Sequence, residues 1–449
     1  MREFEIDIQR TGGAPPDTPV GIAIRSGDIV FTRLLRQGSN IPEDHIDASS
    51  SQLAFWLVDN WWRLVSECVP ATGQSASWRL GHDLASMGGY AWPRLAIWGE
   101  GARIGLSSRS DPPGVVGPVR YLTDALTYVS AASFERSALT FAEQVASEGA
   151  HLASDWDALT SQLKVLNEER QSPDLTAWRR LEAQLGYDVD GAPEAVMMAL
   201  VAFEQEYGFS AVAEAALASQ GSGAAAILEA EIAVAESQHW QCDLTRTALL
   251  VGSVQEVPSV APWELGERAA AKVRAMVGYP KGALSNSALG EVLAVRSAAF
   301  RSKDKNATAR AYGLRLNTGR RRGEVVSLAA SWSADRRFEF ARALGDAIWT
   351  QGERLGPLTR AKSERQKFQR AFAQSLLCPY EDLISYIGDD VTDGALSAAA
   401  RHFLVSEKVV RSLLVNKHDL SRRRLGQTFR SSTDIVDAPV TFEDAVEAA

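Results

Sequence analysis

Cysteine is scarce in this sequence of 449 residues, and long apolar runs are absent from it. The three cysteines, Cys68, Cys242 and Cys378, are scattered and give neither a disulfide framework nor a metal-ligand pair. No run of about eighteen apolar residues occurs, so we expect no membrane span and no membrane partner. The first residues alternate like a strand and lack the apolar core of a signal peptide. These absences predict a cytoplasmic protein.

Charge is unevenly distributed along the chain, whose formal net charge is −9. From Arg301 to Arg430 there are 25 Lys and Arg residues against 14 Asp and Glu residues, whereas the rest carries 22 against 42. Such asymmetry can indicate nucleic-acid binding by the basic part. Alternatively, the basic and acidic parts face each other within the fold. The sequence leaves both interpretations open.

The overall composition, 45% hydrophobic and 23% charged, is that of a globular protein with about two to four domains. We expect an α+β fold that is predominantly α-helical. Residues 1–118 combine strand patterns with an aromatic-rich helical pattern at Ser51–Leu64, which we expect to form the local core. The strand patterns on both sides of Gly99–Gly101 favour a hairpin over a phosphate-binding loop. Residues 119–255 are Ala-rich and carry six segments with helical spacing, which predicts a separate helical domain.

The stretch Arg336–Trp349 has a helical pattern whose one face is small and apolar. The residues of that face are Phe338, Ala341, Leu344, Gly345 and Ile348. This pattern predicts a helix buried against a sheet. Two strand patterns, Gly313–Gly319 and Gly323–Leu328, precede the helix around an Arg-rich turn. The segment Phe372–Pro379, with the sequence FAQSLLCP, follows it.

This succession of hairpin, helix and downstream segment resembles the core of ImmA/IrrE-like metallopeptidases. In that family the helix carries two His residues one turn apart, which bind zinc, and a Glu between them acts as general base. The corresponding positions here hold Arg342, Ala343 and Asp346. The resemblance therefore implies a zincin-like fold over residues 256–380 without the catalytic residues. It also implies a setting in bacterial regulation, stress response or conflict with phage and mobile elements.

The family's third zinc ligand also has no equivalent in this sequence. That ligand, usually a Glu, lies about four residues before the Phe of the downstream segment. Phe368 occupies the corresponding position, and the nearest carboxylate is Glu364, one turn away. Because zinc requires His, Cys or carboxylate ligands in fixed geometry, we expect no metal and no cofactor.

A second motif lies within residues 381–430. Ala400–Leu414 resembles a helix-turn-helix core, in which Ser406 would cap the second helix and Leu404 stands where the turn usually has Gly. The candidate nucleic-acid contacts on that helix and beyond it are Lys408, Arg411, Ser412, Asn416, Arg422, Arg423 and Arg424. Alternatively, the apolar residues of the second helix only dock it on the preceding core. Residues 431–449 form an acidic tail that we expect to be disordered.

These observations lead to three functional hypotheses. The leading one is a catalytically inactive regulatory or scaffold protein that binds a protein partner, or DNA or RNA. The second is a DNA-binding regulator that uses the C-terminal basic segment. The third is a hydrolase with a relocated metal site, because carboxylates near the degenerate helix could bind Mg²⁺ or Mn²⁺. Those carboxylates are Asp335, Glu339, Asp346, Glu353 and Glu364, and the arginines among them make salt bridges the simpler explanation.

Overall fold

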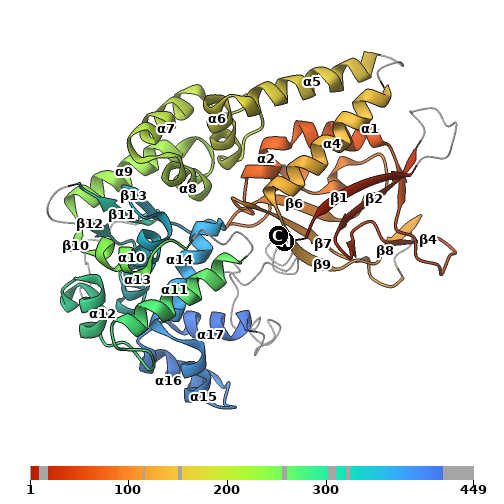
Figure 1. Cartoon of the computed structure of the whole chain (residues 1–449). Helices are drawn as coiled ribbons and strands as arrows, with labels where there is room; N and C mark the ends of the chain where they lie inside the picture. Colours follow the sequence, from red (N-terminus) through yellow and green to blue (C-terminus); the bar gives the residue numbers. More distant parts are fainter. Residues whose placement is uncertain are drawn as a thin grey trace. The chain divides into compact units, whose positions relative to one another are not determined.

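The computed structural model describes residues 2–9, 19–114, 117–149, 154–254, 260–301, 310–319 and 324–417 (Figure 1). The chain divides between Ala192 and Pro193 into two compact units, which we call the first and second units. Helical residues outnumber strand residues in the described part, which confirms a predominantly α-helical α+β protein. The Arg-rich turn at 320–323, Arg422–Arg424 and the acidic tail lie outside the described residues.

The first unit contains two antiparallel sheets, a short strand pair and six α-helices among its described residues. One sheet comprises β1 (Phe4–Gln9), β2 (Val20–Ser26), β3 (Ile29–Val30) and β5 (Ile46–Ala48). The other comprises β6 (Leu95–Gly99), β7 (Arg103–Ser108) and β9 (Ala125–Ser130), and β4 (Leu34–Arg36) pairs with β8 (Val119–Tyr121). The helices are α1 (Ser50–Asp59), α2 (Trp61–Ser66), α3 (Ala76–His82), α4 (Ala131–Gly149), α5 (Ser154–Gln171) and α6 (Pro173–Gln184).

The core of the first unit contains the predicted aromatic cluster. Trp61 and Trp62 are buried, and the ring of Phe134 on α4 lies 5.0 Å from that of Phe4 on β1. The expected hairpin around Gly99–Gly101 is confirmed as β6 and β7. The helix expected over Ser51–Leu64 is instead two helices, which meet at Asn60.

The predicted domain boundaries at residues 118 and 255 are wrong. The first lies inside the first unit, because α4 packs on β1 and α1 and so completes the N-terminal core. The second lies inside the second unit, because α9 (Ala224–Ser237) packs on the sheet built from later strands. The six expected helical segments do form, as α4–α9, but they are shared between the two units.

The second unit is built on one antiparallel sheet of strand order β10-β12-β11-β13. These strands are β10 (Trp240–Cys242), β11 (Gly313–Asn317), β12 (Glu324–Ser327) and β13 (Leu355–Leu358). The helices around it are α7 (Glu194–Tyr207), α8 (Phe209–Ser219), α9, α10 (Leu244–Val251), α11 (Pro262–Met276), α12 (Asn286–Leu293), α13 (Ser333–Thr350), α14 (Glu364–Leu377), α15 (Tyr380–Ile387), α16 (Asp393–Phe403) and α17 (Glu407–Asn416). The predicted hairpin and following buried helix are confirmed as β11, β12 and α13.

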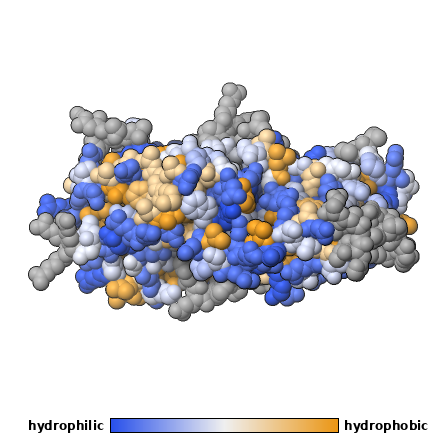
Figure 2. Space-filling view, turned by 90° about the horizontal axis from the view of Figure 1, so that it is seen from above, coloured by the Kyte–Doolittle hydropathy of each residue, from blue (hydrophilic) through white to orange (hydrophobic). Residues whose placement is uncertain are grey.

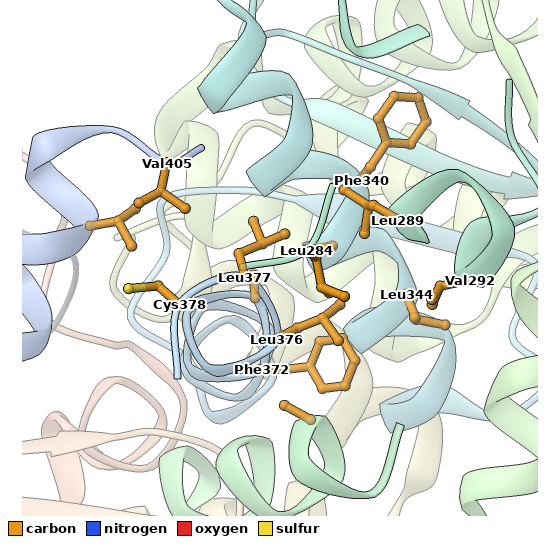
Figure 3. Close-up of a cluster of buried hydrophobic side chains, with 14 of the residues drawn as sticks. Leu284, Leu289, Val292, Phe340, Leu344, Phe372, Leu376, Leu377, Cys378 and Val405 are labelled. Carbon is orange, nitrogen blue, oxygen red and sulfur yellow. The ribbon is translucent and has the colours of Figure 1, made fainter. Parts of the chain in front are cut away.

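Helix α13 lies at the centre of the second unit. It packs against α10, α14 and the sheet, and α14 packs in turn on α11. Figure 3 shows Phe340 and Leu344 of α13 beside Phe372 and Leu376 of α14, with Leu289 and Val292 of α12 completing the cluster. Helix α12 ends at Leu293, because Ala294 adopts a left-handed conformation with φ of 52°.

None of the described helices combines the length and hydropathy of a membrane span. On the face drawn in Figure 2, hydrophilic residues alternate with smaller hydrophobic areas.

Candidate functional site

Two charged side chains, Arg342 and Asp346, are buried on α13. Arg342 is 7% exposed and Asp346 is fully buried, whereas Ala343 lies in the hydrophobic core. Helix α13 presents the two charged residues to β13 and α14, so their partners come from elements that are distant in sequence. The region is therefore an internal polar network within an otherwise apolar core.

Asp346 is held by two guanidinium groups and one amide. Its Oδ1 accepts hydrogen bonds from Arg365 Nε at 2.7 Å and from Gln369 Nε2 at 2.7 Å. Its Oδ2 accepts from Arg315 Nε at 2.8 Å and from Arg365 Nη2 at 3.1 Å. Burial alone would raise the pKa of Asp346, but the positive charges of Arg365 and Arg315 outweigh it and hold that pKa below its usual value. Asp346 is therefore an ionised carboxylate with both oxygens occupied.

The two arginines extend the network to further carboxylates. Arg315 Nη1 donates to Glu324 Oε1 at 2.7 Å, and Arg365 Nη1 donates to Glu353 Oε2 at 2.9 Å. Two guanidinium groups thus connect three carboxylates, and charge-assisted bonds of this length are strong. Each buried charge has an opposite charge beside it, which is the condition for tolerating ions inside a protein.

Gly356 on β13 provides the space for this network. A Cβ atom at Gly356 would lie 1.9 Å from Asp346 Oδ2 and 2.8 Å from Arg315 Nε. Such distances are shorter than any non-bonded contact, so a side chain here would displace the carboxylate or the guanidinium. The strand approaches α13 closely because this residue has no side chain.

Arg342 does not pair with Asp346, although the two residues are one helical turn apart. Its Nη2 donates to Thr359 O at 2.6 Å, Gln366 Oε1 at 2.5 Å and Gln369 Oε1 at 3.1 Å. Burial lowers the pKa of Arg342 to about 9. Gln369 connects the two charged residues, because its oxygen accepts from Arg342 and its nitrogen donates to Asp346.

The expected third-ligand position on α14 holds an aromatic residue that packs against other aromatic rings. Phe368 is fully buried, and its ring lies 5.0 Å from that of Trp349 and 6.2 Å from that of Phe372. Glu364 is the first residue of α14. The α14 residues that contact Asp346 are Arg365 and Gln369 instead.

Three of the five carboxylates proposed for a relocated metal site, Asp346, Glu339 and Glu353, accept bonds from other groups of the protein. Glu339 Oε2 accepts from the backbone amides of Ala329 and Ala330 at 2.9 and 3.0 Å. Glu353 binds Arg365. Within the described ranges, no group of three or more His, Cys, Asp and Glu residues is arranged to hold a metal ion.

The helix-turn-helix segment has the expected turn but not the expected outer face. Leu404, between α16 and α17, adopts the left-handed conformation with φ of 55°. Arg411 and Ser412 were expected to face outward but are 8% and 4% exposed. Arg411 Nη2 binds Asp393 Oδ1 at 2.7 Å, so this guanidinium is already engaged by a carboxylate.

Two further candidate contacts of this segment, Lys408 and Asn416, are half-buried. Ser406 occupies the N-cap position of α17 without a side-chain capping bond. The apolar residues of the second helix pack in the main core, which confirms the docking alternative for them: Val405, Val409, Val410, Leu413 and Leu414. The turn itself is fixed to α13, because Arg337 Nε donates to Leu404 O at 3.1 Å.

Sequence patterns did not identify the main partners of Asp346. Arg315 lies on a strand, and Arg365 and Gln369 lie on a helix, where polar residues are usually solvated. The sequence of α14 contained one signal. Its Arg and Gln residues are interspersed with Phe368 and Phe372, so the helix has no separate polar and apolar faces. Comparison with known proteins adds no relative, since no family model, curated protein or solved structure matches the chain.

Proposed function

We propose that this chain is a catalytically inactive relative of ImmA/IrrE-like metallopeptidases that acts by binding a partner. Support comes from the order of β11, β12, α13 and α14, which is the order expected from the family resemblance. The proposal includes a zincin-like core in the second unit, a cytoplasmic location and a role in bacterial regulation, stress response or phage defence. Its N-terminal unit would act as a scaffold.

The observation that carries the proposal is the environment of Asp346. Zinc sites use His, Cys or carboxylate ligands around an accessible cation position. Here both oxygens of Asp346 accept bonds from Arg315, Arg365 and Gln369, all between 2.7 and 3.1 Å. A cation at this position would have to displace two guanidinium groups, which repel it. The position of the family's catalytic centre therefore serves stability here, and partner binding is the function that remains.

Elemental analysis and a peptidase assay on the purified full chain test the loss of catalysis. We expect far less than one zinc per chain and no peptide hydrolysis. The triple substitution Arg342→His, Ala343→Glu and Asp346→His should not restore zinc binding, because Arg365 and Phe368 still occupy the α14 side. One zinc per chain, removed by a chelator together with a peptidase activity, would overturn the proposal.

A DNA-binding regulator is the second candidate, and the left-handed turn at Leu404 is the observation that favours it. Base contacts by Arg411 would require this residue to leave Asp393. One experiment separates the candidates: co-expression with the products of neighbouring genes, followed by size exclusion, beside fluorescence anisotropy with duplex DNA at about 100 mM salt. A stable protein complex without DNA binding supports the leading proposal. DNA binding that Arg422→Ala, Arg423→Ala and Arg424→Ala weaken together supports the second.

A further inference from the structure

A cavity of about 280 Å³ lies in the first unit, whereas the Asp346 network belongs to the second unit. Residues of α2, α4, α5 and α6 line it, and Figure 1 shows these four helices within the first unit. Its floor contains Trp61 and Trp62, and its polar lining includes Arg170 and Arg180. The volume is close to the lower end of ligand pockets, roughly 300–1,000 Å³, so the ligand group it holds is small.

Arg170 is positioned in this cavity without strong ion pairs. Its guanidinium carbon lies 5.1 Å from the centre of the Trp61 ring, which orients the group by a cation–π contact. Its hydrogen bonds are long: 3.3 Å to Glu135 Oε2 and 3.4 Å to Asn167 Oδ1. Charge-assisted bonds are normally about 2.7–2.9 Å. Because a guanidinium has five N–H donors, Arg170 retains the capacity to bind an anion.

Arg179, on the same helix as Arg180, shows what a structural arginine looks like in this unit. It donates to Glu169 at 2.7 Å, to Glu182 at 2.9 Å and to Asp190 at 2.7 Å. Arg180, by contrast, is exposed and has no ion-pair partner among the residues that the structure describes. Of the charged side chains that line the cavity, two are arginines and one is the carboxylate of Glu135. The lining therefore has a net positive charge.

A larger hollow of about 550 Å³ between α4 and α5 adjoins this cavity, and Asn167 and Gln171 line both. Its walls include Ala146 and Leu163, so part of it is apolar. We propose that the first unit binds a small molecule whose anionic head, a carboxylate or a phosphate, lies between Arg170 and Arg180. The body of that molecule extends along the hollow beside Leu163.

Isothermal titration calorimetry of the full chain tests this site with three probes: inorganic phosphate, acetate and octanoate. We expect phosphate or octanoate to bind, and octanoate to bind more tightly than acetate because its chain occupies the hollow. Arg180→Gln should weaken binding about tenfold, the loss expected when one charge-assisted contact is removed. Arg180 is exposed, so this variant keeps its fold. Arg79→Gln, an exposed arginine of α3, is the control and should bind as the wild type does.

The outcomes decide each part of the proposal. Binding of phosphate identifies a phosphate head, and binding of octanoate without phosphate identifies a carboxylate head. Equal affinities for acetate and octanoate would overturn the role of the hollow. If no probe binds, or if Arg180→Gln and Arg79→Gln bind equally, the anion site is refuted. None of these results depends on the zinc content or on the partner of the second unit.

Discussion

Each unit buries a carboxylate between two basic side chains, but these side chains differ in kind. In the second unit, Asp346 lies between Arg315 and Arg365, whose charges are permanent at ordinary pH. In the first unit, Glu67 Oε2 accepts from Arg63 Nε at 2.7 Å and lies 3.0 Å from His82 Nε2. Asp346 is thus surrounded by two guanidinium groups, whereas Glu67 has one guanidinium group and one imidazole ring beside it.

His82 has a second hydrogen-bond partner besides Glu67, the backbone carbonyl of Ile97. His82 Nδ1 lies 2.7 Å from Ile97 O, and a carbonyl oxygen only accepts, so Nδ1 carries a proton. His82 is fully buried and stacks on Trp78 with ring centres 4.3 Å apart. The first unit therefore holds an imidazole ring between a carboxylate and a backbone carbonyl in its core, where the second unit has only guanidinium and amide donors around Asp346.

Removal of Asp346 should have the largest effect. Asp346→Ala leaves Arg315 and Arg365 buried beside a cavity, and breaking a buried pair in this way costs about 3–5 kcal/mol. We expect urea unfolding to shift to lower concentration and hydrogen exchange to increase in α13 and α14. Asp389→Ala, at an exposed site of the second unit, should change neither. A loss below about 1 kcal/mol would mean that solvent reaches the network.

The next largest loss of stability is expected at Gly356, where the backbone of β13 lies close to the Asp346 network. Gly356→Ala places a Cβ atom 1.9 Å from Asp346 Oδ2, so β13 or the carboxylate must move. Overpacking of this kind costs about 1–3 kcal/mol. The same unfolding and hydrogen-exchange measurements apply. The matched control is Gly394→Ala, whose Cβ would have its nearest neighbour at 4.0 Å, and wild-type stability of Gly356→Ala would contradict the close packing.

The smallest loss of stability is expected at Glu67, and this loss should depend on pH. Burial raises the pKa of Glu67, but His82 and Arg63 outweigh it, so the folded-state pKa lies below the unfolded value of about 4.3. A lowered carboxyl pKa stabilises the fold above about pH 4.3, and that stability is lost as pH falls through the folded-state pKa. Glu67→Gln should cost about 1.5 kcal/mol at pH 7, because Arg63 keeps Asp188 as a partner.

The pH profile separates this role from simple packing. Thermal melts of Glu67→Gln between pH 3 and 7 should show a smaller stability loss on acidification than the wild type, because the amide does not titrate. Glu168→Gln, at an exposed site of α5, should follow the wild-type profile. If Glu67→Gln also loses stability as steeply as the wild type, Glu67 does not carry the acid sensitivity of the first unit.

Periodicity predicted those parts of the second unit whose polar and apolar residues separate by face. The β11–β12 hairpin and α13 follow alternating and helical patterns, so their existence could be predicted. The Leu404 turn could also be located, because its neighbours Val405 and Val410 match a motif with fixed spacing. The domain boundary was not predicted, although Gly191 and Pro193 mark a break beside Ala192, because sequence spacing does not show that the preceding helices bury their apolar faces against early strands.

The site itself could be predicted only in part. The spacing of Arg342 and Asp346, one helical turn apart, allows an ion pair between them, either exposed or partly buried, but in the structure Asp346 pairs with Arg315 and Arg365. Their actual partners come from β11, β13 and α14, and local spacing carries no information about such distant pairing. For Arg411 the expectation of an outward side chain was wrong, because a helix buried on most of its surface leaves few positions for solvent.

Gln369 has a consequence for how the two central helices find each other. Its amide has an accepting end toward Arg342 and a donating end toward Asp346, so only one orientation satisfies both. A slip of α14 by one residue would rotate this amide by about 100° around the helix axis and leave both charges without it. Apolar contacts alone tolerate several alignments of similar energy. The polar bridge therefore selects a single register of α14 on α13, and it makes misaligned, partly folded forms of the second unit unfavourable.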